Sequence, residues 1–226
     1  MSGFGQVFYW FKLGENLQWA RHDGTSDGTN AWTGEGGGFN VGSGWNAYSS
    51  VFCGGSQGII YAITPDGDMH WYSHDGFKDG TATWTAGDGG RLVGSGWNAY
   101  ARVFAGGQRS VAGESNGLVI YGITPDGELD WYRHEGWTDG SPVWTGGDGG
   151  RRVGSGWNAY SRVFGSYDAD GQIYGIKGPS GFELDWYRHD GWRNGEPTWT
   201  AGDGGRRAGR GFRDQPVFPG SMVALT

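Results

Sequence analysis

Short runs of alternating apolar and polar residues, separated by turn dipeptides, follow one another along the chain. In a representative stretch, residues 59–64 and 69–72 form two β-type runs that flank the turn signal Pro65-Asp66-Gly67. Apolar positions with the 3.6-residue period of an amphipathic helix are absent from the sequence. The pattern predicts an all-β chain built as a meander of hairpins.

The same hairpin unit occurs four times. A Trp-x-x-His run recurs at residues 19–24, 71–76, 131–136 and 186–191, with histidine spacings of 52, 60 and 55. The block Val-Gly-Ser-Gly-Trp-Asn-Ala-Tyr recurs unchanged at residues 41–48, 93–100 and 153–160 and is degraded at residues 208–213. A Trp-Thr pair lies between these elements each time. Each unit therefore offers about four strands, which is the content of one propeller blade.

These repeats predict a β-propeller of four-stranded antiparallel blades, with four blades in a single domain of residues 1–226. The repeats span about residues 1–50 with 217–226, 51–102, 103–162 and 163–216. The first repeat lacks its initial Val-Phe strand, and Val217-Phe218 is the counterpart, so we expect the N- and C-terminal strands to share a blade. Residues 221–226 resemble residues 59–64 and compete for a place there. A five-bladed ring would need a contribution from another chain.

The net charge and the composition argue against several classes of function. The 226 residues carry a net charge of −7, which argues against nucleic acid as a partner. The 49 glycines accompany 14 Trp, 11 Tyr and 11 Phe, which indicates a folded, turn-rich protein. No apolar run approaches the ~20 residues of a membrane span, so we expect no membrane insertion.

Cysteine usage and the first residues bear on bound metals and on location. Cys53 is the single cysteine, so an internal disulfide is ruled out, and no Cys/His cluster has zinc spacing. Asp168-Ala169-Asp170-Gly171 resembles part of a calcium loop but is better interpreted as a plain turn. We predict no metal and no cofactor. The chain starts without a secretory signal, which favours a cytoplasmic or leaderless secreted protein.

Several repeated residues have the chemistry of carbohydrate recognition. A pyranose presents an apolar C–H face to aromatic rings and hydroxyl or acetamido groups to amides, and the Gly-Ser-Gly-Trp-Asn blocks supply both. Packing between blades is an equally good interpretation of their tryptophans. The candidate carbohydrate-binding residues are Trp45, Asn46, Trp97, Asn98, Trp157, Asn158, Trp32, Trp84, Trp144, Trp199, Phe77, Trp137, Trp192, His22, Asp23, His74, Asp75, His134, Glu135, His189 and Asp190.

Burial and exposure are expected to differ among the repeated positions. The residue after each His-Asp/Glu-Gly run varies from Thr25 to an aromatic in the other repeats, which predicts solvent-exposed stacking platforms. The strand tryptophans, such as Trp71, share a face with an apolar neighbour and are predicted to pack in the core. For the histidines, an imidazole fixed by a buried hydrogen bond is favoured over a ligand contact.

One longer stretch resembles a known family. Residues 120–134 read Ile-Tyr-Gly-Ile-Thr-Pro-Asp-Gly-Glu-Leu-Asp-Trp-Tyr-Arg-His and precede Trp144, Val-Gly-Ser-Gly-Trp at 153–157 and Val163-Phe164. The combined pattern resembles a repeat of the tachylectin-2 family of β-propeller lectins and covers essentially the whole chain. The resemblance implies a propeller closed by its terminal strands, with repeated sugar sites for N-acetylated hexosamines such as GlcNAc or GalNAc. It also implies neither catalysis nor a metal.

The chain departs from that family in two ways. The best-known member has five blades and shorter repeats, whereas this chain has four units and an insertion at residues 108–116. The fourth unit has Ala208, Arg210, Phe212 and Arg213 in place of Val, Ser, Trp and Asn. We therefore expect three good sugar sites, or four.

The sequence thus predicts a non-enzymatic, multivalent lectin whose partners are glycans containing N-acetylhexosamine, with homo-oligomers as a further possibility. Two other functions stay open. One is a protein–protein interaction scaffold, because propellers present such surfaces. The other is a glycan-active enzyme, which is less favoured because four copies of one residue set make equivalent sites rather than a set of different catalytic groups.

Overall fold

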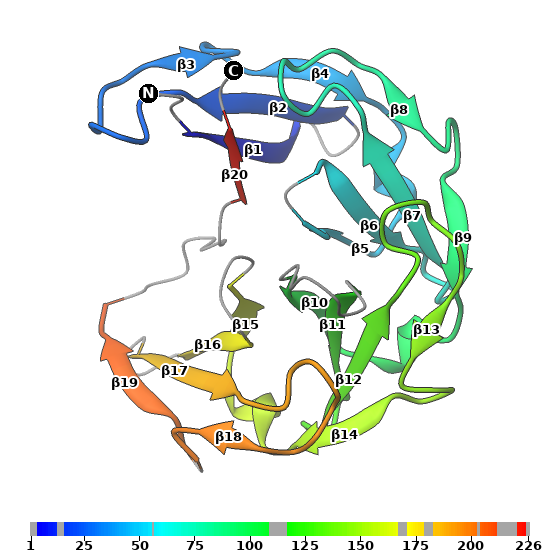
Figure 1. The fold of residues 1–226 in the computed structure, drawn as a ribbon, viewed down its shortest axis with the longest axis vertical. Helices are drawn as coiled ribbons and strands as arrows, with labels where there is room; N and C mark the ends of the chain where they lie inside the picture. The colour runs from blue at the N-terminus through cyan, green and yellow to red at the C-terminus, as the bar shows by residue number, and fades with distance from the viewer. Residues whose placement is uncertain are drawn as a thin grey trace. The chain divides into compact units, whose positions relative to one another are not determined.

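The computed structural model of the protein is all-β (Figure 1). The structure describes residues 4–12, 16–55, 57–108, 117–166, 171–178, 183–202, 204–211 and 221–224. In these ranges the helical segments are the three 3-10 turns η1 (Trp45–Ala47), η2 (Trp97–Ala99) and η3 (Trp157–Ala159). No helix in the described part of the chain has the length and apolar character needed to cross a membrane. Several predictions lie outside the described residues, namely those on residues 109–116, Asp168, Asp170, Phe212, Arg213 and Val217-Phe218.

Each repeat forms one antiparallel sheet, called a blade here. Blade 1 contains β1 (Phe4–Lys12), β2 (Asn16–His22), β3 (Trp32–Thr33), β4 (Phe39–Gly42) and β20 (Ser221–Ala224). Blade 2 contains β5 (Ser50–Cys53), β6 (Ile59–Ile63), β7 (Met69–His74), β8 (Trp84–Thr85) and β9 (Arg91–Gly94). Blade 3 contains β10 (Arg102–Gly107), β11 (Leu118–Ile123), β12 (Leu129–His134), β13 (Trp144–Thr145) and β14 (Arg151–Gly154). Blade 4 contains β15 (Arg162–Gly165), β16 (Gln172–Lys177), β17 (Glu183–His189), β18 (Trp199–Thr200) and β19 (Arg206–Gly209).

The predicted fold class, an all-β chain with the four antiparallel blades of a four-bladed β-propeller, is confirmed. The fourth strand of each blade is split by a glycine-rich turn into two short segments. In blade 3, β13 pairs with the end of β12 at His134 and β14 pairs with its beginning at Leu129. The split leaves the central strand of each blade covered along its length by two different parts of the same repeat.

The two ends of the chain meet in blade 1. Strand β20 pairs with β1 in antiparallel register, with Phe4 opposite Ala224 and Val7 opposite Ser221 (Figure 1). This position beside β1 corresponds to that of β5 beside β6 in blade 2. The prediction of a shared blade is confirmed, and residues 221–224 occupy the place that we had assigned to Val217-Phe218. Residues 4–12 already form the next strand, so the C-terminal segment pairs on its free edge.

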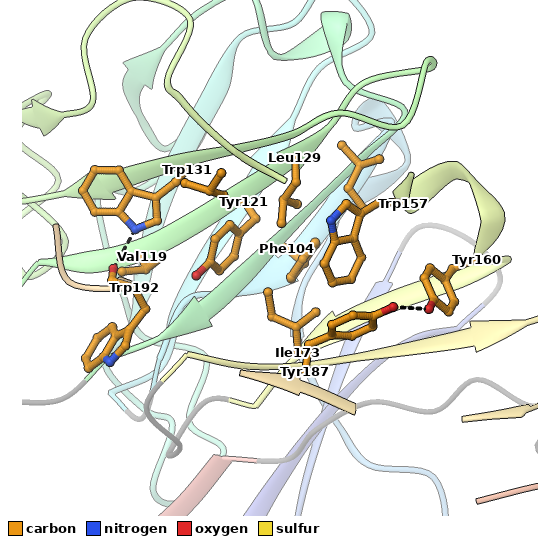
Figure 2. Packing of buried hydrophobic residues seen from close by; sticks show 12 residues of the cluster. Phe104, Val119, Tyr121, Leu129, Trp131, Trp157, Tyr160, Ile173, Tyr187 and Trp192 are labelled. Carbon is orange, nitrogen blue, oxygen red and sulfur yellow. Dashed lines mark hydrogen bonds between the residues drawn. The ribbon is translucent and has the colours of Figure 1, made fainter. Parts of the chain in front are cut away.

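The chain divides into two compact units, each with its own core. The first unit comprises residues 1–93 with 220–226, and the second comprises residues 94–219. In the first, Trp19 of blade 1, Trp45 and Ile60 of blade 2 belong to one buried cluster. In the second, the corresponding cluster includes Trp131 and Ile173 (Figure 2). Each fully buried apolar side chain contributes roughly 1.5–3 kcal/mol of stabilisation.

The strand tryptophans pack in these cores, as predicted. Trp19 and Trp131 are fully buried. Their indole N–H groups donate to backbone carbonyls of the neighbouring blade, from Trp19 to Phe77 at 2.9 Å and from Trp131 to Trp192 at 2.6 Å. Figure 2 shows the second of these bonds. A buried indole needs such an acceptor, so each bond fixes the neighbouring loop as well as the ring.

Candidate binding site

Each Gly-Trp-Asn block folds as a single 3-10 turn. The turn is entered through a glycine in the left-handed region, with φ of 80° at both Gly96 and Gly156, which explains the small residue there. In η3 the ring of Trp157 points inward and is 4% exposed, while Asn158 lies on the surface. The turn therefore separates the two groups that we expected to act together on a sugar.

The tryptophans of all three blocks are packing residues. Trp157 lies against Tyr187 and Trp199 of blade 4, with ring centroids 4.8 and 5.8 Å apart. Trp45 and Trp97 make the equivalent contacts with the blade that follows them, and both are at most 6% exposed. Rings buried to this degree present no face to a ligand. The packing interpretation is confirmed, and sugar stacking on these three rings is not supported.

Three of the four repeated histidines are also buried. His74, His134 and His189 have no exposed surface. Each ring stacks on the tryptophan of the Trp-Thr pair in its own blade, and the ring centroids of His134 and Trp144 are 4.3 Å apart. Nε2 of each lies 2.8 Å from a backbone carbonyl oxygen. The structural interpretation of these histidines is confirmed. His22 makes the same carbonyl contact, to Thr29, but is half-buried.

The hydrogen bonds fix the tautomer of the buried imidazoles. A carbonyl oxygen can only accept, so Nε2 of His189 carries the proton and Nδ1 accepts from the hydroxyl of Tyr121, 2.7 Å away. Burial lowers the pKa of His134 and of His189 to about 4, and it lowers the pKa of His74 as well. These imidazoles are neutral at pH 7.

The carboxylates that follow the histidines are engaged within their own blades. Glu135 accepts from Nε of Arg133 and from the hydroxyl of Thr145, at 2.7 and 2.6 Å. Asp23, Asp75 and Asp190 each accept from the threonine of the Trp-Thr pair in the same way. The tryptophans of the Trp-Thr pairs, Trp32, Trp84, Trp144 and Trp199, are half-buried.

The aromatic residues after the His-Asp/Glu-Gly runs are not exposed platforms. Trp137 and Trp192 are 5% and 6% exposed, and Phe77 is half-buried. Trp192 belongs to the core of the second unit, and its carbonyl holds the indole of Trp131. The predicted solvent exposure of Trp137 and Trp192 is wrong.

The structure separates the candidate residues into two sets. Asn158 lies beside the Gly127 turn that precedes β12, where the backbone N–H of Trp157 donates to the Gly127 carbonyl at 2.9 Å. His134 and Glu135 lie at the other end of β12. Five residue steps separate these ends, or roughly 17 Å along a strand. A single sugar ring cannot contact both sets, so the predicted site divides into two.

The end of a blade at which the asparagine of the 3-10 turn lies is called its asparagine end here. A charged cluster lies there that the sequence analysis did not identify. In blade 4, Asp185 accepts from Arg207 Nε and Lys177 Nζ, both at 2.9 Å, and from the Tyr160 hydroxyl at 3.2 Å. In blade 3, Asp130 is bound in the same way by Arg152 and Tyr100. Both carboxylates are nearly buried, whereas their basic partners are partly exposed.

The electrostatics of this cluster keep Asp185 ionised. Burial alone would raise the pKa of its carboxyl group, but hydrogen bonds from Lys177 and Arg207 hold the pKa below its ordinary value. The sequence signal was the aspartate that directly precedes the strand tryptophan in the third and fourth repeats, at Asp130 and Asp185. Alternation places Asp130 and Trp131 on opposite faces of one strand, and a charge within a buried strand implies a partner.

Charge, amide and backbone groups thus meet at one end of each of these blades. Around Asn158 are the Gly127 turn of blade 3 and, through Tyr160, the Asp185 cluster of blade 4. An amide both donates and accepts, a carboxylate accepts, and guanidinium and ammonium groups donate. This set can satisfy hydroxyl and acetamido groups. Blade 2 differs here, because His70 stands in place of the aspartate and Leu92 in place of the arginine.

Comparisons with known proteins add a distant similarity of fold. No protein-family model and no curated protein matches the chain. Among solved structures, a mutant of the Aleuria aurantia lectin in complex with Fucα1-6GlcNAc matches 92% of this chain at 18% identity, with a TM-score of 0.44. The complex of that lectin with α-methyl-L-fucoside matches 88% of the chain at 16% identity, with a TM-score of 0.39. The chain spans 65% and 64% of the lengths of those two chains. Similarities this distant indicate no ligand for this protein.

Proposed function

We propose that the protein is a non-enzymatic, multivalent lectin that binds glycans at the asparagine ends of its blades. The observation that carries the proposal is the exposed asparagine of each 3-10 turn, repeated at Asn46, Asn98 and Asn158, each two residues after a glycine in the left-handed conformation. At two of these positions, a buried aspartate with a partly exposed arginine belongs to the following blade. Equivalent polar sites repeated along one chain favour a glycan-coated surface, because linked occupancy raises avidity by about 10²–10⁴.

N-acetylated hexosamines, GlcNAc or GalNAc, are the proposed ligands. An acetamido group offers one N–H donor and one carbonyl acceptor, which a side-chain amide such as that of Asn158 complements with two hydrogen bonds. The resemblance to tachylectin-2 repeats points to the same sugars. The buried block tryptophans act in this proposal by holding the asparagine turn in place, and stacking on them is not required.

The blades are not expected to bind equally well. Asn98 and Asn158 precede blades with the Tyr–Asp–Arg arrangement, whereas Asn46 precedes blade 2, which has His70 and Leu92. We therefore propose two strong sites and one weaker site among the described blades.

A glycan array screened with labelled protein, with free GlcNAc and GalNAc as competitors, tests this proposal. Selective binding that one of these sugars abolishes would support it. The triple variant Asn46→Ala, Asn98→Ala and Asn158→Ala removes three exposed side chains and should lose at least tenfold in apparent affinity while unfolding like the parent.

The matched control is Asp88→Asn, an exposed polar substitution in the glycine turn between β8 and β9. It should bind glycans like the parent. A blank array from folded protein would overturn the lectin proposal. Unchanged binding by the triple asparagine variant would leave a lectin but remove these turns from its site.

A further inference from the structure

Blade 1 differs from the other three in the size of two neighbouring positions. Ala20 on β2 stands where the other blades have a tyrosine, such as Tyr72 opposite Ile60. Trp10 on β1 stands where they have Ala62, Gly122 or Gly175. Large and small residues have therefore changed places between the two strands.

This exchange accompanies a groove that lies entirely on blade 1. In blade 2 the tyrosine ring of Tyr72 covers Gly90, and in blade 1 the indole of Trp10 covers the equivalent Gly38. The ring of Tyr72 also packs against Trp45 of the Gly-Trp-Asn block. The small side chain of Ala20 leaves space at the equivalent position in blade 1. The groove has a volume of about 450 Å³. It is lined by Phe8, Trp10, Ala20, Asn30, Trp32 and Glu35, together with the glycines of the turn between β3 and β4.

Aromatic rings form its walls. Phe8 and Trp10 are 41% and 37% exposed, among the most exposed large apolar residues of the described chain. The ring centroids of Phe8 and Trp32 are 5.4 Å apart and the ring planes are inclined by 46°. The two rings therefore form an angled wall rather than one flat platform. The indole N–H of Trp32 donates to Asn30 Oδ1 at 3.0 Å, whereas Trp84 and Trp199 donate to backbone carbonyls of the preceding repeat.

The groove carries a negative charge without a counter-ion. Glu35 lines it, and the described residues supply no ion pair or hydrogen bond to its carboxylate. The other polar side chain is Asn30, whose oxygen is already used by Trp32. A sugar ring needs several donors and acceptors, and few are free here. Aromatic faces and a carboxylate instead attract a cation that carries its own apolar surface.

We propose that the groove of blade 1 binds a quaternary ammonium group. Its methyl groups would pack on the rings of Phe8, Trp10 and Trp32, and its charge would face the carboxylate of Glu35. The protein's net charge of −7 favours the approach of cations. A flexible, hydrated ammonium such as a lysine side chain matches this lining less well, because no cluster of acceptors is present to replace its water.

Saturation-transfer NMR with choline tests the proposal, because it detects ligand methyl groups in contact with the protein. The decisive comparison is with 3,3-dimethylbutan-1-ol, which has the shape of choline but no charge. We expect choline to bind at least tenfold more tightly than the alcohol. Equal binding of the two compounds, or no choline signal at millimolar concentration, would overturn the proposal.

Two pairs of variants locate the site. Glu35→Gln should weaken choline binding about tenfold, whereas Asp88→Asn, in the equivalent glycine turn of blade 2, should leave it unchanged. Trp10→Ala should abolish binding, whereas Leu92→Ala, which also removes an exposed apolar side chain, should not. Choline binding that survives both Trp10→Ala and Glu35→Gln would place the ligand elsewhere and overturn the proposal.

One further result would also overturn it. If free GlcNAc displaces choline, and Trp10→Ala abolishes both, the groove is a sugar site. Glycan binding is measured in parallel on the same variants. The choline proposal can therefore fail while the lectin proposal stands, and the reverse.

Discussion

The hydroxyl of Tyr121 on β11 donates to Nδ1 of His189 on β17, across the boundary between blades 3 and 4, over 2.7 Å. Tyr9 and His74 repeat this bond between blades 1 and 2 at the same distance. Each imidazole thereby uses one nitrogen within its own blade and the other between blades. His74 and His189, which were ligand candidates in the sequence, therefore join neighbouring blades.

Stability is expected to fall in mild acid. Burial lowers the pKa of His134 and His189 to about 4, whereas the unfolded chain titrates near 6.5. Below that value the unfolded state binds more protons than the folded state. The free energy of unfolding is therefore at its plateau above about pH 7. It falls by at most ~1.4 kcal/mol per pH unit for each histidine between pH 6.5 and 4, and levels off below the folded pKa.

Urea unfolding at pH 7.5, 6.0 and 5.0 measures this dependence. A His189→Gln variant should be less stable at pH 7.5 but should show a shallower fall, because one depressed pKa has been removed. Stability that is constant or rises towards pH 5 would contradict the assignment of neutral, buried imidazoles.

The tyrosine hydroxyl between the blades should contribute measurably. Tyr121→Phe leaves the buried Nδ1 of His189 without a donor, and we expect a loss of about 1–3 kcal/mol in the free energy of unfolding. Tyr174→Phe is the matched control, since Tyr174 occupies the same position on β16 and stacks on a phenylalanine as Tyr121 does. The described residues give its hydroxyl no hydrogen bond. Equal losses in the two variants, compared by urea unfolding, would show that the hydroxyl–imidazole bond adds nothing.

The sequence was sufficient to predict the blades because turn signals and strand alternation are local properties. The Asp-Gly turn at Asp66-Gly67 and the buried Trp71 follow from spacing alone. The burial of Trp137 and Trp192 was not predictable in this way. Trp192 is buried because it packs against residues of blade 3, and the sequence of its own loop does not specify that contact.

The candidate site was only partly predictable for a related reason. Repetition made Asn158 and His134 equally good candidates for the binding site, because a residue can be repeated for the sake of either the shared fold or a shared site. Strand register decides between them, since it places the two residues at opposite ends of β12. The Asp185 cluster was missed because its arginine, Arg207, is 22 residues away and meets it only through strand pairing.

Trp192 should behave as a core residue when it is substituted. Trp192→Thr introduces the residue type that the first repeat has at Thr25, and we expect it to cost about 3–5 kcal/mol of stability by removing a buried ring. Glycan binding per folded molecule, measured at low temperature, should be unchanged. A variant that keeps parental stability but loses glycan binding would restore Trp192 to the sugar site.

Blade 2 offers a gain-of-function test of the asparagine-end site. Nδ1 of His70 is buried and has no hydrogen-bond partner among the described residues, and the ring centroids of His70 and Tyr48 are 5.9 Å apart. In blade 4 the equivalent Asp185 accepts from Tyr160 and Arg207. The double variant His70→Asp with Leu92→Arg should rebuild this arrangement in blade 2.

The two substitutions should depend on each other. His70→Asp alone buries a carboxylate without a guanidinium partner and should be destabilising, and adding Leu92→Arg should recover about 1.5–3 kcal/mol in a double-mutant cycle. Calorimetric titration with GlcNAc then counts the strong sites. One additional strong site in the double variant would place the Asp–Arg pair in the sugar site, because no other part of the blade has changed. An unchanged count, with the stability coupling present, would make Asp130 and Asp185 structural and confine recognition to the asparagine turns.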